Sequence, residues 1–395
     1  MKKDAIFTVF LVSISSIALI GFGFLGGRYE SRFAQKKQID AWEHGLTLGA
    51  LLKDTKSEAP SDVVHAYEKD RQDPKALTGY SWSPLNLPTP FVGGAPLPGL
   101  QENAHINHQQ FRNERELVIP KPEGVLRVFL TGGSTAYSSG ASGDDRTIGT
   151  YLEQDLNAQL GKSSSKRIEV FTLATPGWAS THERIAIENL LSELQPDLVI
   201  SLSGNNDVHW AQLGRNVLWF RTYFDAHVFS LIQNSYWMAE RIRLEDNIPS
   251  SPFPIDPKIV AERLMKNVNL IVFTLSRTHT PYLFVLQPTL AAVSKPLTAR
   301  EAAQLENRSI RENARPKRQT GGASEHTDYF QACYQEIDST LKTANNPNLH
   351  YLNLDHVFES HASEEIFIDS YHFGDRGNQI VAQAIAEEAG PFLAN

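Results

Sequence analysis

Short apolar runs alternate with amphipathic stretches through the C-terminal two thirds of the chain. The apolar runs predict five buried strands, at 125–130, 168–173, 197–202, 281–287 and 350–354. Positions with helical periodicity between and after them predict helices at 147–160, 182–194, 257–275, 328–341 and 374–388. Strands that alternate with helices indicate an α/β fold, in which a parallel sheet is covered on both faces.

The start of the chain follows a different pattern. Residues 5–25 contain no charged side chain, and a helix of about 20 residues is long enough to cross the hydrocarbon core of a bilayer. A cleaved signal peptide usually has a shorter apolar stretch, about 7–15 residues, and an Ala-x-Ala-like site. The segment therefore predicts an uncleaved, single-pass membrane anchor over residues 1–27, rather than a signal peptide.

Basic residues flank this segment on both sides, so charge counting alone does not orient it. They are Lys2 and Lys3 before the segment, and Arg28, Arg32, Lys36 and Lys37 after it. A very short tail before a hydrophobic start is typical of a signal-anchor, which leaves the bulk of the chain outside the cytoplasm. We therefore expect the catalytic domain to be extracytoplasmic.

Between the anchor and the main domain lies a segment over residues 28–101. Residues 28–58 have apolar positions at helical spacing and predict an amphipathic juxtamembrane helix, packed on the main domain or lying at the bilayer surface. Residues 72–101 hold six prolines and predict a connector. The resulting domain organisation is an anchor at 1–27, a helix and connector at 28–101, and a main domain at 102–395.

Composition narrows the classes of function. The net charge is −8, whereas a nucleic-acid binder normally carries a basic surplus, so no nucleic-acid partner is expected. Hydrophobic residues make up 41% of the chain and charged residues 21%, a globular balance that excludes a wholly disordered protein. Cys333 is the one cysteine, which excludes an intrachain disulfide and a cysteine-rich metal site.

Three further features allow a plain and a functional interpretation. Residues 295–327 are polar and are interpreted as a solvated surface insertion, with a basic lip for an anionic substrate as the alternative. Aromatic residues are dense over 210–237 and predict a buried cap, or else a ligand platform or membrane-facing cover. His105 and His108 form a close pair without an obvious third ligand and are interpreted as loop residues, so we predict no metal and no cofactor.

Chemically competent residues follow the predicted strands, where the sites of parallel sheets form. Ser134 follows the first strand in TGGSTA, Gly177 follows the second in ATPGWAS, and Asn206 follows the third in SGNND. Asp369 and His372 stand just before the last helix. A serine becomes a nucleophile when a base such as His372 takes its proton, and Asp369 can orient that base. The backbone N–H groups of Ser134 and Gly177, with the Asn206 amide, would supply three oxyanion donors.

Two other glycine-rich motifs do not fit the turn at Ser134. A phosphate-binding loop requires GxxxxGK[ST] or GxGxxG, and the residues around Ser134 match neither motif. The nucleophile elbow of α/β-hydrolases is GxSxG, whereas the residues flanking the serine here are Gly132 and Ala136.

These residues carry a resemblance to a known family. Ser134 in GGST, Gly177 in ATPGW, Asn206 in GNND and His372 in DSYH resemble the four motif blocks of the SGNH (GDSL-type) hydrolase superfamily, over about residues 100–395. The resemblance implies a flavodoxin-like, three-layer α/β/α domain that hydrolyses or transfers acyl esters. It implies Ser134 as the nucleophile, Asp369 and His372 as its partners, and Ser134, Gly177 and Asn206 as oxyanion donors.

The chain departs from the commoner motif at one position, where Gly133 replaces the Asp that usually precedes the serine. Three functions stay open from the sequence. The first is an envelope-anchored serine esterase or deacylase acting on an acyl ester, such as an acylated glycan or lipid. The others are an O-acyltransferase acting on cell-envelope polysaccharide and a non-catalytic domain that binds a carbohydrate or a protein partner. We expect Asp207 to have a structural role, capping the turn or helix that follows it.

Overall fold

The computed structural model describes residues 86–89, 92–101, 104–161, 164–214, 254–313 and 323–394. The anchor predicted at 5–25 and the juxtamembrane helix predicted at 28–58 lie outside these ranges and stay predictions. Within the described ranges, no helix combines the length and the apolar character needed to span a bilayer.

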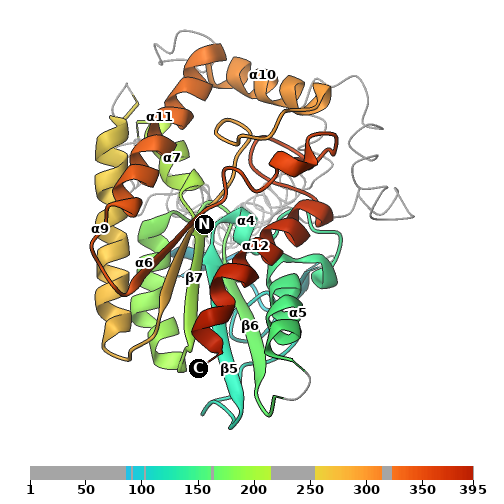
Figure 1. Cartoon of the computed structure of the whole chain (residues 1–395), viewed down its shortest axis with the longest axis vertical. Coiled ribbons are helices and arrows are strands. Elements are labelled where there is room, and N and C mark those ends of the chain that lie inside the picture. Colours follow the sequence, from blue (N-terminus) through green and yellow to red (C-terminus); the bar gives the residue numbers. More distant parts are fainter. Residues whose placement is uncertain are drawn as a thin grey trace, which may run out of the picture. The chain divides into compact units, whose positions relative to one another are not determined.

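A five-stranded parallel sheet forms the centre of the domain (Figure 1). Its strands are β5 (Val125–Gly132), β6 (Arg167–Ala174), β7 (Leu198–Ser203), β8 (Tyr282–Leu286) and β9 (Leu349–Asn353), in the spatial order β6-β5-β7-β8-β9. The five predicted strands are therefore confirmed to within two residues at each end. Numbered along the chain the order is 2-1-3-4-5, which is the flavodoxin-like order, and its direction reverses between β5 and β7.

Helices cover both faces of this sheet, as the alternating pattern predicts (Figure 1). One face is covered by α5 (Ile148–Leu160) and α12 (Asp375–Leu393), and the other by α6 (Ser180–Asn189), α9 (Pro257–Ser276) and α11 (Ala323–Lys342). Val128 and Leu130 of β5 join the first apolar cluster, and Phe129 between them joins the second. Burial on both faces explains why the strands are continuous apolar runs.

Several elements were not predicted from the sequence. They are α4 (Ser134–Tyr137), α7 (Asn205–Gln212), α10 (Ala299–Asn313), and the 3₁₀ helices η2 (Asp144–Arg146) and η4 (Glu359–His361). The helix predicted at 182–194 is divided into α6 and the 3₁₀ helix η3 (Leu191–Leu194). Two antiparallel strand pairs precede the sheet: β1 (Asn86–Thr89) with β2 (Gly93–Pro96), and β3 (Gly99–Gln101) with β4 (Ala104–Ile106). Three of these short strands lie in the segment predicted as a Pro-rich connector.

The interpretation of residues 295–327 as a solvated insertion holds for only one face of its described N-terminal part: Ala299, Ala302 and Glu306 are exposed, and the opposite face of α10 is buried. The side chains of Lys295 and Glu301 are completely buried and lie 2.5 Å apart as an ion pair. Arg300 and Gln304, in the first turns of α10, are buried as well. Polar residues are usually exposed unless they are paired, and here each of the four has a partner.

Candidate active site

The loop after β5 places Ser134 at the point where the strand order reverses. Gly132 adopts φ +154°, and a Cβ atom there would lie 2.3 Å from the carbonyl oxygen of Leu202 in β7. Only glycine allows the two strands to approach this closely. Gly133 then caps α4, so that Ser134 is the first helical residue.

Three of the predicted site residues share a pattern of exposure. Ser134, Gly177 and Asn206 are each partly exposed, while the residues on both sides of each are buried. The three follow β5, β6 and β7, whose carboxyl ends are neighbours in the sheet. One solvent-accessible spot at this edge therefore has the three predicted oxyanion donors around it.

A continuous hydrogen-bond chain connects Ser134, His372 and Asp369. Ser134 Oγ lies 2.6 Å from Nε2 of His372, and Nδ1 of the same ring lies 2.9 Å from Oδ2 of Asp369. The carboxylate accepts from Nδ1–H, which fixes the tautomer in which Nε2 accepts from the serine hydroxyl. His372 is buried, and this restricts its ring to one orientation.

Local hydrogen bonds keep the Asp369 carboxylate ionised. Burial by itself raises the pKa of Asp369, but the charge that His372 carries when protonated, its ring hydrogen bond and two backbone N–H groups together lower the pKa by more than burial raises it. Those groups belong to Tyr371 and His372 and lie 2.7 and 2.9 Å from Oδ1. The net result is a pKa below the ordinary value of aspartate, so the residue is charged at neutral pH.

Helix α7 holds the loop that carries Gly177. Asn206 Nδ2 donates to the carbonyl oxygen of Trp178 at 2.7 Å, and the Trp210 indole N–H donates to the carbonyl oxygen of Gly177 at 3.2 Å. An amide nitrogen carries two hydrogens, so Asn206 has a second N–H to donate to an oxyanion.

Gly133 is the position at which the chain departs from the commoner motif, and the structure gives the reason. A Cβ atom on Gly133 would lie 2.3 Å from Nδ2 of Asn206 and 3.1 Å from the carbonyl oxygen of Trp178. The amide of Asn206 therefore occupies the space that a side chain at 133 would need.

The structure corrects the position predicted for Asp207. Its carboxylate is completely buried and accepts from the backbone N–H and the hydroxyl of Ser180, at 3.0 and 2.5 Å. Ser180 is the first residue of α6, so Asp207 caps the helix that precedes it in the chain rather than the one that follows. Burial raises the pKa of Asp207 to about 6, although the Ser180 bonds oppose this change.

Asn206 and Asp207 should respond differently to substitution. Asn206→Ala removes a predicted oxyanion donor and should lower the single-turnover rate by about 10²- to 10³-fold. It also removes the bond to Trp178, which should reduce the free energy of unfolding by about 1 kcal/mol. Asp207→Asn should lower the melting temperature and leave the rate closer to wild type, because asparagine has one acceptor oxygen for the two donors of Ser180, so one buried donor loses its partner. Assigning catalysis to Asn206 would be wrong if Asp207→Asn cost the larger rate factor at unchanged stability.

A second buried acid, Glu183 of α6, was not identified from the sequence. It accepts a hydrogen bond from the hydroxyl of Ser203, the last residue of β7. Burial, with a smaller contribution from the charge of Asp207, raises the pKa of Glu183 to about 8. Glu183 is therefore protonated at neutral pH. Nothing in the sequence pattern distinguishes it from an exposed helical glutamate.

Glu183 should make stability fall as the pH rises. The folded state holds its proton up to about pH 8 and the unfolded state only to about pH 4.5. Its stabilising contribution is therefore complete below pH 4.5 and is lost as the pH rises to 8, by about 1.4 kcal/mol per pH unit at most. Glutamine has no proton to lose, so Glu183→Gln should become increasingly stable relative to wild type from pH 5 to 8.5. Urea unfolding at several pH values measures this, with Glu188→Gln on the same helix as the control. A pH-independent difference would contradict the assignment.

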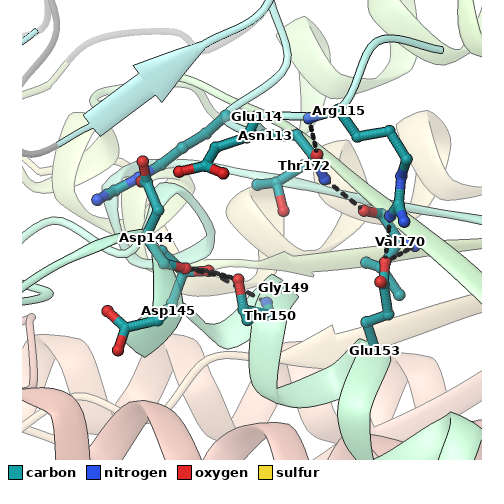
Figure 2. Close-up of a pocket in the computed structure, with 12 residues that line it drawn as sticks. Asn113, Glu114, Arg115, Asp144, Asp145, Gly149, Thr150, Glu153, Val170 and Thr172 are labelled. Carbon is teal, nitrogen blue, oxygen red and sulfur yellow. Dashed lines mark hydrogen bonds and ion pairs between the residues drawn. The ribbon is translucent and has the colours of Figure 1, made fainter. Parts of the chain in front are cut away.

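A cavity of about 340 Å³ lies elsewhere, beside the edge strand β6 (Figure 2). Arg112 lies 2.9 Å from Asp144 and Arg115 lies 2.5 Å from Glu153, so its two arginines are each paired with a carboxylate. Arg112 also donates to the carbonyl oxygens of Tyr137 and Ser138, the last residue of α4 and the residue that follows it. None of the predicted catalytic or oxyanion residues lines this cavity. Because its two arginines are paired with carboxylates, we interpret the cavity as structural.

The remaining sequence interpretations have mixed outcomes. His105 lies in β4 rather than in a loop, and the His108 ring lies 2.6 Å from Glu116. No group of three or more His, Cys, Asp or Glu side chains suited to a metal ion occurs in the described ranges. Of the aromatic-rich segment 210–237, Trp210 is buried in α7, and the aromatic residues after it lie outside the described part of the chain.

Comparisons with known proteins give distant structural matches. No protein-family model matches the chain, and no curated protein matches its sequence. An acetyl xylan esterase is 14% identical, covering 66% of this chain and 98% of its own, with a TM-score of 0.37. A lipase from a goat rumen metagenome is 10% identical, covering 68% and 98%, with a TM-score of 0.40. A putative GDSL-like lipase from Parabacteroides merdae is 11% identical, covering 68% and 96%, with a TM-score of 0.37.

Proposed function

We propose that this protein is a serine esterase of the SGNH (GDSL) type, which hydrolyses an acyl ester through an acyl-enzyme. The observation that supports it most is the hydrogen-bond chain from Ser134 through His372 to Asp369. It lies at the strand-order reversal, where α/β sheets form their sites. Ser134 is partly exposed and can be reached by a substrate, while His372 is buried and its ring stays within hydrogen-bond distance of Ser134 Oγ.

Acylation follows from this geometry. Nε2 of His372 takes the hydroxyl proton as Ser134 Oγ attacks the ester carbonyl carbon, and the carbonyl electron pair moves onto oxygen. The Ser134 and Gly177 N–H groups and the Asn206 amide donate to that oxyanion. When the tetrahedral intermediate collapses, the bond to the alcohol oxygen breaks and His372 returns the proton to the leaving alcohol.

Deacylation repeats these steps with water as the nucleophile. His372 takes a proton from water, the hydroxide adds to the acyl carbon, and the acid leaves as the proton returns to Ser134 Oγ. Asp369 stays ionised throughout and stabilises the imidazolium that forms in each half.

The test of the proposal is covalent labelling combined with a substrate panel. A fluorophosphonate should label the full chain at Ser134, located by peptide mass spectrometry, and the protein should hydrolyse at least one ester class. The panel contains short- and long-chain esters and acetylated glycans, with and without a saccharide as acyl acceptor. Acylated saccharide as the main product would identify transfer instead of hydrolysis. Labelling at another residue, or no labelling at all, would refute the proposal.

We further propose that residues 5–25 anchor this esterase in a membrane with the catalytic domain outside the cytoplasm. The support is the length of the uncharged segment and the basic residues Lys2 and Lys3, which precede it with Asp4 in between. The intact chain should resist carbonate extraction of membranes. A shortened soluble form that begins after the apolar segment would instead show a cleaved signal peptide.

A further inference from the structure

We propose that Glu301, at the start of α10, is a positioning residue. It fixes the loop that carries Asp369 and His372 in its position relative to Ser134. This inference rests on the proposed function, since it concerns the same catalytic chain. Figure 1 shows α10 at the end of the sheet where α7 also lies, remote from the other end of the strands. The segment was interpreted from the sequence as a surface insertion, and its burial gives it this different role.

The loop itself is a tight turn closed by its own backbone. Ile368 N–H donates to the carbonyl oxygen of His372 at 2.9 Å, and Gly374 N–H donates to that of Ile366 at 3.2 Å. Together with the Asp369 bonds to the following N–H groups, these contacts fix Asp369 relative to His372. They do not fix either residue relative to Ser134, which belongs to a different part of the chain.

Helix α10 binds three consecutive residues of this loop through the backbone. Glu301 Oε1 accepts from the N–H groups of Ile366 and Phe367, at 3.0 and 3.2 Å. Arg300 donates to the carbonyl oxygen of Phe367 at 2.9 Å, and Gln304 donates to that of Ile368 at 3.0 Å. The residue after Ile368 is Asp369, so this contact is directly adjacent to the catalytic chain.

The other side of the loop is held by the segment after β8 and by α4. Ser370 presents its carbonyl oxygen to Thr289 Oγ1 at 2.9 Å and to Leu290 N–H at 3.2 Å. The carbonyl oxygen of Tyr371 accepts from Gln287 at 3.3 Å and from Thr135 at 3.4 Å. Hydrogen bonds therefore hold the loop at two places. Helix α10 binds the residues before Asp369, and the segment after β8 together with α4 binds the residues after it.

Glu301 can hold the loop in this way because its carboxylate is ionised and fully used. Its second oxygen accepts from Lys295 Nζ at 2.5 Å and from Thr298 N–H at 3.0 Å, so four donors surround the group. Burial alone raises the pKa of Glu301, but these donors outweigh burial and bring it below the ordinary value. A buried ion pair such as Lys295–Glu301 adds little to the free energy of unfolding. The hydrogen bonds that Glu301 accepts from two adjacent N–H groups instead fix the position of the loop backbone.

The principal test is Glu301→Gln in the full chain. Glutamine has the same shape as glutamate, but its NH₂ group must face either Lys295 or the two loop N–H groups. At that contact two hydrogen-bond donors then face each other and the hydrogen bond is lost. A displacement of about 1 Å at a catalytic group can cost about 10²-fold in rate. We therefore expect a 10- to 100-fold lower kcat, a KM within twofold of wild type, and a shifted pH midpoint of kcat/KM. Hydrogen exchange of the peptide spanning 365–374 should accelerate.

Two further variants keep the result interpretable. Glu306→Gln changes an exposed glutamate on the same helix and should behave as wild type in every measurement. Gln304→Met removes only the bond to Ile368 and keeps the ion pair, so it tests the positioning role if Glu301→Gln does not fold. It should show the same changes at smaller size.

The outcomes separate this inference from the proposed function. Wild-type kcat, pH midpoint and exchange in a folded Glu301→Gln would overturn it, as would a lower melting temperature alone with an unchanged pH midpoint. Wild-type protein that turns over no ester and takes no label at Ser134 refutes the esterase proposal, while the exchange measurement still decides whether Glu301 holds the loop.

Discussion

Replacing Ser134 with alanine should lower ester turnover by about 10⁵- to 10⁶-fold and abolish fluorophosphonate labelling. Without Oγ no acyl-enzyme can form, and the remaining oxyanion donors can only assist direct attack by water. The fold should persist, because the substitution removes one hydroxyl from a partly exposed position at the start of a short helix. Initial rates with the best ester, together with the melting temperature, measure the two effects.

The matched control for this substitution is Ser294→Ala, at an exposed serine in the loop that precedes α10. It should retain wild-type turnover and labelling. Ester turnover within tenfold of wild type in Ser134→Ala would exclude this serine as the nucleophile, even if the fold and the hydrogen-bond chain are as described.

The sheet could be predicted because its signal is local. Strands β5 to β8 are buried along almost their whole length, so burial appears in the sequence as a nearly continuous apolar run that needs no knowledge of its neighbours. Strand β9, at the edge of the sheet, is only partly buried. The helices between strands repeat their apolar positions with the helical period for the same reason. The spatial order of the strands has no such local signal, because it depends on the face of the sheet against which each connecting helix packs.

The placement of Ser134, Asp369 and His372 could be predicted for a topological reason. Parallel strands direct their carboxyl ends to one edge, so residues that follow different strands meet there although they are far apart in the chain. Gly133 could be recognised as a departure from the motif but not explained. The explanation requires the position of the Asn206 amide, which belongs to another strand end.

The buried polar residues could not be predicted, because their partners come from distant segments. Glu301 looks like an ordinary residue of a polar helix until Ile366 and Phe367 are seen to donate to it. Asp207 was expected to cap the turn or helix that follows it, whereas its carboxylate accepts from Ser180 at the start of α6, which meets the start of α7 at the same edge of the sheet. In both cases the composition indicates exposure, and only tertiary pairing makes burial favourable.

Asp369→Asn should lower kcat by about 10⁴-fold while the loop keeps its shape. The amide oxygen of asparagine can still accept from the N–H groups of Tyr371 and His372, which both bond to one carboxylate oxygen in the wild type. The amide NH₂ then faces Nδ1 of His372 as a donor, which drives the ring proton to Nε2. In that tautomer Nε2 donates toward Ser134 Oγ and cannot accept its proton.

Single-turnover kinetics and the melting temperature of the Asp369→Asn variant separate loss of chemistry from loss of fold. Glu364→Gln is the control, because this partly exposed carboxylate lies just before the same loop and bonds to His361 and Arg376 rather than to His372. It should stay within about threefold of the wild-type rate, since the loss of an exposed ion pair costs little. If the asparagine variant were folded and lost less than tenfold in rate, the Asp369 carboxylate would not be what orients His372. The hydrogen bonds to the loop backbone would then be its main role.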